Sequence, residues 1–150
     1  MRTASSNQTA QTDALREYLG RHELVIMAFL FGSWAQGHAG LDSDVDVAVY
    51  LRSEEMASEE VEAAGRLSRT AQDIWGNLER IIGQEVDLVV LNDAAPSVAL
   101  SALQGIALVV KDRRLHLDFL FRTTSEAADF REWVESYWQL KQSYQSATQA

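Results

Sequence analysis

The sequence predicts a single domain of the α/β or α+β class. Its 150 residues are enough for one hydrophobic core, and no linker or internal repeat divides them. Four apolar segments of strand length alternate with segments of helical pattern. The connection between the first two apolar segments is too short for the crossover helix of a doubly wound parallel sheet. We therefore expect a sheet that departs from regular doubly wound topology.

The N-terminal half contains two expected strands between two expected helices. Residues 12–21 have the pattern of a short helix, and "ELVIMAFLF" (23–31) is a continuous apolar strand of the kind that is covered on both faces. "DVDVAVYL" (44–51) is the second strand, with a polar N-terminal half. In residues 53–83 apolar side chains recur every three or four positions, which predicts a long amphipathic helix.

The C-terminal half adds two further strands with a helix between them. "EVDLVVL" (85–91) and "IALVVKD" (106–112) are apolar runs of strand length. Residues 95–105 carry a proline near the start and a glycine at the end, as is typical of a helix. These elements place the core of the domain at residues 12–112.

The two ends of the chain are expected to differ from this core. Residues 1–11 are rich in Ser, Thr and Gln and predict a flexible N-terminus, and residues 146–150 predict a loose tail. Residues 113–145 predict a helical segment of the same domain. Its aromatic residues on one helical face include Phe130, Trp133, Tyr137 and Trp138. That face either packs on the sheet, which is the simpler interpretation, or forms a partner or dimer surface.

The composition excludes several classes of function. The chain has no cysteine, so disulfides, thiolate metal sites and a cysteine nucleophile are excluded. Its formal net charge of −9 argues against direct nucleic-acid binding, because phosphates repel an acidic surface. No apolar run reaches the roughly 18 residues that span a bilayer, and the polar N-terminus lacks the apolar core of an export signal. We therefore expect a cytoplasmic protein that binds no membrane.

Aspartates interrupt two of the expected strands. Asp44 and Asp46 alternate with valines, and residues two apart in a strand project from the same face. Asp87 has the same setting in the third strand. Carboxylates this close together are unfavourable without a cation, and Mg²⁺ prefers oxygen ligands completed by water and substrate phosphate. We predict that the three aspartates meet in space and hold metal for phosphoryl or nucleotidyl transfer.

Gly32-Ser33 ends the first strand and supplies a second part of the expected site. The following "SWAQGH" predicts a helical turn or short helix, and the backbone N–H groups at a helix start can face a phosphate. Glycine at position 32 lets a phosphate approach the backbone, and the Ser33 hydroxyl adds a donor. Gly37 and Gly40 then allow the chain to turn back into the strand that carries the acids.

Gly32, Ser33, ten intervening residues and then Asp44-Val45-Asp46 form the pattern Gly-Ser-x10-Asp-x-Asp. This pattern resembles the signature of the DNA polymerase β-like nucleotidyltransferase superfamily. The longer string "GSWAQGHAGLDSDVDVAVYL" is similar to the minimal nucleotidyltransferase (MNT) branch, and the likeness covers about residues 12–112. The resemblance implies a nucleotidyltransferase fold with a small mixed sheet of about four strands flanked by helices.

The resemblance also implies roles for single residues. Asp44 and Asp46 would bind two Mg²⁺ ions and, with Gly32 and Ser33, the phosphates of the nucleotide. Asp87 would act as general base or as a metal-bridging acid on the incoming hydroxyl.

Many proteins of the MNT branch are antitoxins paired with a small helical HEPN ribonuclease. The resemblance therefore implies ATP as substrate, and transfer of AMP to a tyrosine hydroxyl of such a toxin within a hetero-oligomer. Two alternatives stay open. One is an aminoglycoside-type nucleotidyltransferase that modifies a small molecule, although about forty residues after the last strand leave little room for an acceptor-binding domain. The other is a non-catalytic antitoxin that neutralises its toxin by binding.

Overall fold

The structure is a computed structural model that describes residues 2–37, 44–53 and 60–148. Its elements in chain order are α1 (Arg2–Arg21), β1 (Val25–Phe31), β2 (Val45–Leu51), α2 (Glu60–Ile82), β3 (Val86–Val90), the 3-10 helix η1 (Leu91–Asp93), α3 (Pro96–Leu103), β4 (Ile106–Val110) and α4 (Arg113–Thr148). The helices in these ranges include none that is both long and apolar enough to cross a membrane.

The four strands form one mixed sheet in the order β3-β2-β1-β4. The short connection between β1 and β2 makes this pair antiparallel, and β1 is also antiparallel to β4. The long helix α2 crosses over between β2 and β3, which are parallel. The prediction of a small mixed sheet flanked by helices is thereby confirmed.

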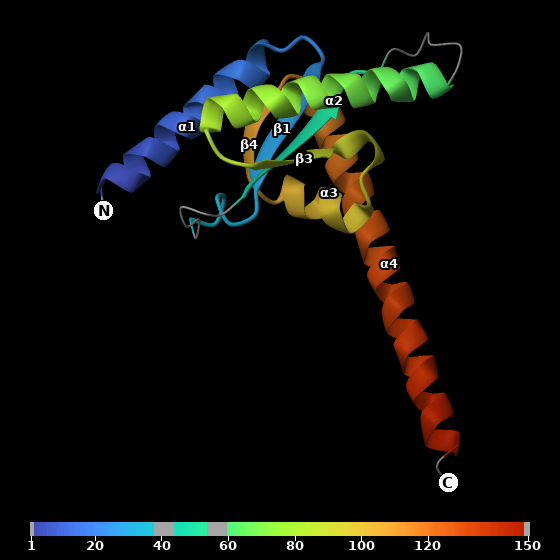
Figure 1. Ribbon diagram of the computed structural model, residues 1–150. Helices are drawn as coiled ribbons and strands as arrows, with labels where there is room; N and C mark the ends of the chain where they lie inside the picture. The colour runs from blue at the N-terminus through green and yellow to red at the C-terminus, as the bar shows by residue number, and fades with distance from the viewer. Residues whose placement is uncertain (1, 38–43, 54–59, 149–150) are drawn as a thin grey trace.

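Helices cover both faces of the sheet (Figure 1). On one face α1 and α2 lie across the strands, and their apolar side chains form a first core with those of the sheet. The central members of this core are Leu15, Leu19, Val45, Val47, Val49, Ile74 and Leu78. On the other face α3 and the first part of α4 form a second core, which includes Met27, Phe29, Ala48, Ala99, Ala102, Leu103 and Phe119.

The alternation along β2 assigns each of its side chains to one face. Val45, Val47 and Val49 belong to the core under α1 and α2, whereas Ala48 belongs to the core under α3 and α4. Because side chains of a strand alternate between faces, Asp46 projects toward the α3 and α4 side. The sequence predicts that Val45, Val47 and Val49 point into a core on the face opposite the aspartates, and the structure confirms this.

The two ends of the chain differ from the sequence-based expectation. Helix α1 begins at Arg2, ten residues before the helix that the sequence predicts from residue 12, and α4 continues as far as Thr148. The flexibility of residues 1–11 and 146–150 stays a prediction. The Thr12 hydroxyl donates a hydrogen bond to the Gln8 carbonyl oxygen (2.8 Å), and the Gln11 side-chain amide donates one to the Ile82 carbonyl oxygen (3.0 Å). The second bond connects α1 to the end of α2, a contact that local composition does not reveal.

The simpler interpretation of the aromatic face near the C-terminus is wrong. Phe130, Trp133, Tyr137 and Trp138 are all at least half exposed on α4 rather than packed on the sheet. The helix is 36 residues long, and its outer half extends away from the sheet (Figure 1).

The sequence predicts Gly105 only as the end of a helix. In the structure the chain at Gly105, between α3 and β4, passes so close to β1 that it has no room for a side chain. A Cβ atom added there would overlap the Leu30 carbonyl oxygen and would lie 2.9 Å from Phe31 Cβ. We expect Gly105→Ala to lower the free energy of unfolding by roughly 1–3 kcal/mol, as overpacked positions do. Gly76→Ala is the matched control, because its added Cβ meets nothing within 4 Å inside helix α2. That variant should gain about 0.5–1 kcal/mol. Urea unfolding of both variants measures the difference, and equal stabilities would contradict the prediction.

Candidate active site

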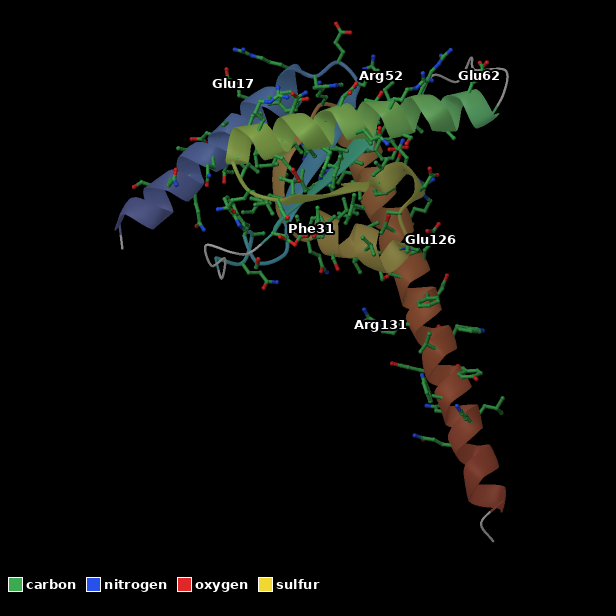
Figure 2. All side chains as sticks on the ribbon, viewed as in Figure 1. Glu17, Phe31, Arg52, Glu62, Glu126 and Arg131 are labelled. Atoms are coloured by element: carbon green, nitrogen blue, oxygen red, sulfur yellow. The ribbon has the colours of Figure 1, made fainter. Side chains whose placement is uncertain are left out.

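The predicted site residues gather at one edge of the sheet, where β1 ends and β2 and β3 begin. Phe31, the last residue of β1, is the register partner of Asp46 in β2. Asp46 is in turn the register partner of Asp87 in β3. Figure 2 labels Phe31 at this edge of the sheet. Residues far apart in the sequence are therefore neighbours here.

Asp46 and Asp87 project from the same face of the sheet. Partners in a parallel pair lie on strands about 4.8 Å apart and point the same way. The position of Val89 in the core under α3 and α4 confirms the face for β3. Asp46 is half-buried and Asp87 is exposed. Asp44 is also exposed and immediately precedes β2.

The negative charges of Asp87 and Asp44 both act on Asp46. Burial raises the pKa of Asp46 above its ordinary value, and the negative charges of Asp87 and then Asp44 raise this pKa further. A carboxylate with two acidic neighbours is stabilised either by a proton or by a cation. The structure thus places Asp46 beside Asp87, with Asp44 near enough for its charge to act on Asp46.

The pKa of Asp46 also predicts how stability depends on pH. A carboxylate whose pKa is raised by folding binds its proton more tightly in the folded state than in the unfolded state. Its contribution to the free energy of unfolding therefore falls as the pH rises. The fall begins near the pKa of an unfolded aspartate, about 3.9, and ends above the folded pKa. Asp46→Asn removes this contribution. With EDTA present, we expect the variant to equal wild type at the acid end of this window and to exceed it above the window by about 0.5 kcal/mol, since solvent screens the interaction. Urea unfolding across this pH range measures the difference, and a constant difference would contradict the prediction.

Gly32 brings the turn after β1 into contact with Asp46. Its φ is +73°, in the left-handed region that favours glycine, and an added Cβ would overlap the Asp46 carboxylate and lie 3.0 Å from its Cγ. The turn continues with a hydrogen bond from the Gln36 N–H to the Gly32 carbonyl oxygen (3.2 Å). This is the helical turn that the sequence predicts, and it places half-buried Ser33 directly after Gly32. Gly40 lies outside the described residues.

A cavity of about 470 Å³ opens beside the Gly32 turn. It lies between this turn, the end of α3 and the start of β4. Its lining residues are Phe31, Gly32, Ala35, Gln36, Ser101, Gln104, Gly105 and Ile106. Polar side chains from the turn and from α3 therefore converge on the space next to the acidic edge.

Several residues that sequence reasoning missed hold β3 in place. The Trp75 indole N–H on α2 donates to the Val86 carbonyl oxygen (2.7 Å), and the Val86 N–H donates to a carboxylate oxygen of Glu79 (3.4 Å). The Val45 N–H donates to the Glu85 carbonyl oxygen (3.1 Å), which sets the register of β2 against β3. These bonds position Asp87 beside Asp46, but nothing in the sequence distinguishes their residues from an ordinary amphipathic helix.

Trp34, the residue after the Gly-Ser pair, is buried in the first core. Its indole N–H finds no hydrogen-bond acceptor among the residues that the structure describes. The buried ring attaches the turn to the core and helps to hold Gly32 next to Asp46.

The acidic edge offers the ligand chemistry of a hard divalent cation, since its donors are carboxylate oxygens. Within residues 2–37, 44–53 and 60–148, no three His, Cys, Asp or Glu side chains are already arranged around one common ion position. Asp87 and Asp44 nevertheless both repel the negative charge of Asp46, and a cation bound here would reduce that repulsion. The donor atoms and charges at this edge suit a divalent cation, although the described side chains do not surround one ion position.

Comparisons with known proteins agree with this fold. The family model described as "Polymerase beta, Nucleotidyltransferase" matches residues 13–114. No curated protein matches the chain significantly. Solved structures with the same fold include a toxin-antitoxin structure with AMP-PNP, which aligns with a TM-score of 0.64 and 20% identity over 85% of this chain and 95% of that chain.

Two other similar structures also come from toxin-antitoxin complexes. One is the toxin-antitoxin MntA-HepT, with a TM-score of 0.57 and 18% identity over 90% of this chain and 96% of that chain. The other is a tri-AMPylated Shewanella oneidensis HEPN toxin in complex with an MNT antitoxin, with a TM-score of 0.61 and 18% identity over 88% of this chain and 96% of that chain. At such identities the likeness shows a shared fold.

Proposed function

Since the chain belongs to the polymerase β nucleotidyltransferase family, we propose that it transfers AMP from ATP to a tyrosine hydroxyl of a HEPN-type toxin, as a cytoplasmic antitoxin. The observation that carries this proposal is the pairing of Asp46 with Asp87 next to the Gly32 turn. That arrangement places a pair of acidic side chains directly against the backbone of the turn that follows β1. The toxin partner and the AMP group are suggested by the similar toxin-antitoxin structures, one of which holds a tri-AMPylated toxin.

Each part of the site has a role in this reaction. The backbone at Gly32 and the hydroxyl of Ser33 bind the phosphates of ATP, and the neighbouring cavity receives the rest of the nucleotide. Asp44, Asp46 and Asp87 would hold Mg²⁺, which supplies neutralisation of charge on the phosphates when bound. The role of these side chains is otherwise to position the reactants.

The chemical step is a displacement at phosphorus. The tyrosine oxygen forms a bond to the α-phosphorus of ATP, the bond from that phosphorus to the bridging oxygen breaks, and pyrophosphate leaves. The proton of the hydroxyl passes to the exposed Asp87 carboxylate, which is accessible at the edge of the sheet.

The decisive experiment is incubation with ATP and Mg²⁺, with and without a purified HEPN-type protein as the candidate acceptor. ATP labelled at the α-phosphate should label the toxin, and ATP labelled at the γ-phosphate should not. Label from both positions, or from γ alone, would contradict nucleotidyl transfer. A tight complex without label would replace this proposal with neutralisation by binding, and label on an aminoglycoside instead of the toxin would replace it with small-molecule modification.

Asp87→Asn should reduce turnover far more than nucleotide binding. Its proposed role arises as the hydroxyl loses its proton, so kcat should fall by about 10²–10⁴-fold while the KM for ATP changes little. Steady-state kinetics with the toxin as acceptor measure both constants. Asp93→Asn, an exposed aspartate at the opposite end of β3, is the control and should match wild type. A raised KM with unchanged kcat would assign Asp87 to nucleotide binding instead.

A further inference from the structure

The outer half of α4 presents a helix face that nothing in the described chain covers. Among the side chains of α4 that the structure describes, up to residue 143, Ala127 is the last that is buried. In Figure 2, Glu126 lies on α4 near the body of the domain, whereas Arg131 already lies on the part that extends beyond it.

Four large side chains form a continuous seam along this extension. They are Phe130, Trp133, Tyr137 and Leu140, with exposed fractions of 58%, 64%, 51% and 63%. The ring centroids of Phe130 and Trp133 are 6.2 Å apart, and those of Trp133 and Tyr137 are 6.1 Å apart. An apolar row of this length on one face marks a contact surface.

The spacing of the seam indicates what covers it. Its residues follow one another at intervals of three, four and three, which is the heptad repeat of helices that pair side by side. The same repeat leads back to Phe119 and Thr123, which are buried inside the domain. The face that packs internally near the sheet thus continues outward as a coiled-coil face without a partner helix.

We propose that the seam binds the seam of a second copy of this chain, with the two α4 helices antiparallel. Glu126 occupies the heptad position that precedes Phe130, the first residue of the seam. Lys141 directly follows Leu140, at the outer end of the seam. In a parallel pair two Glu126 carboxylates would face each other in the interface. In an antiparallel pair Glu126 instead lies beside Lys141 of the other copy, which is favourable.

Two further features favour the antiparallel pair. At its centre the flanking residues are Val134 and Ser136, so no like charges meet where the helices are closest. The domain bodies also lie at opposite ends of the paired helices, because each α4 extends away from its own body (Figure 1). A parallel pair would bring both bodies to the same end.

The seam supplies enough surface for a stable contact. Large aromatic side chains bury about 150–250 Å² each, so seam residues that are half to two-thirds exposed contribute on the order of 100 Å² apiece. Two copies then bury about 1,000 Å² with their flanking residues, which is the size of a weak, reversible interface.

Sedimentation of the full chain over micromolar concentrations tests the dimer. We expect a species of twice the 16.7 kDa chain mass, and Trp133→Gln should weaken dimerisation at least about tenfold. Phe121→Gln is the matched control, since Phe121 is 78% exposed on the opposite side of the same helix and should leave dimerisation unchanged. A monomer at every concentration, or equal weakening by both variants, would overturn the proposal.

Crosslinking with a short bismaleimide tests the direction of the helices without altering the seam. The chain has no cysteine, so Ser136→Cys and Ser125→Cys each introduce a single thiol. Both serines donate to the carbonyl oxygen four residues earlier, at 2.9 Å and 3.0 Å. In the antiparallel pair the two residues 136 are adjacent while the two residues 125 are about 30 Å apart. Efficient crosslinking at 136 alone is expected. Equal crosslinking at both positions, or a seam protected only by another protein, would overturn the proposal.

Discussion

Asp44→Asn and Asp46→Asn should each abolish transfer of AMP while the fold stays intact. Each substitution removes one negative charge from the acidic edge, where Asp46 already interacts with both Asp44 and Asp87. Loss of even a supporting group at a metal site typically costs 10–100-fold, so loss of a proposed ligand should reduce activity by at least about a hundredfold. Transfer of α-labelled phosphate to the toxin is the measurement.

The control for these variants is Asp118→Asn, the same chemical change at an exposed position on α4. It should retain full activity. Circular dichroism and urea unfolding show whether each variant is folded, and Asp46→Asn is expected to be at least as stable as wild type at neutral pH in EDTA. Unchanged transfer by both Asp44→Asn and Asp46→Asn would remove the proposed mechanism.

Gly32→Ala should disable the site through the backbone rather than through a carboxylate. An alanine Cβ at this position occupies the place of the Asp46 carboxylate, which must move away from Asp87 and from the turn. The positive φ of +73° adds strain of about 1–2 kcal/mol. We expect transfer to fall by well over tenfold, because displacement of a reacting group by about 1 Å can cost a hundredfold.

Gly37→Ala separates the two effects of that substitution. Gly37 has nearly the same φ, +74°, but an added Cβ meets nothing within 4 Å. Both variants should lose stability through the strained φ, and Gly32→Ala should lose more because its Cβ overlaps the Asp46 carboxylate, but only Gly32→Ala should lose most of its transfer activity. Equal activities in the two variants would show that contact with Asp46 is irrelevant to the reaction.

Much of the fold follows from patterns that can be read directly from the sequence. Each of the four strands lies within the apolar run that predicts it, because a buried strand needs a continuous or alternating apolar segment. A helix such as α2 can join two parallel strands, so the sequence allows Asp87 to stand next to Asp46 if the third strand lies beside the second. The structure shows that these strands are neighbours.

Other features depend on tertiary distances that no local pattern encodes. Gly105 has the sequence pattern of a helix end, yet its importance comes from the Leu30 carbonyl oxygen on another strand. Trp75 fits the face of an amphipathic helix, yet its N–H holds the start of β3. The aromatic face of α4 has the same periodicity whether it is covered or exposed, and only the course of the helix past the domain decides between these outcomes.

The crossover through α2 has a consequence for the order in which activity arises during synthesis. Asp46 and Asp87 belong to strands separated by a helix of 23 residues, so their meeting requires that this helix has first docked. Contacts between distant chain segments form late, because closing the intervening loop costs entropy before it yields any stabilisation. A nascent chain that has emerged only through β2 carries two of the three acids but lacks their partner strand. Such an incomplete protein is therefore expected to lack the proposed transferase activity.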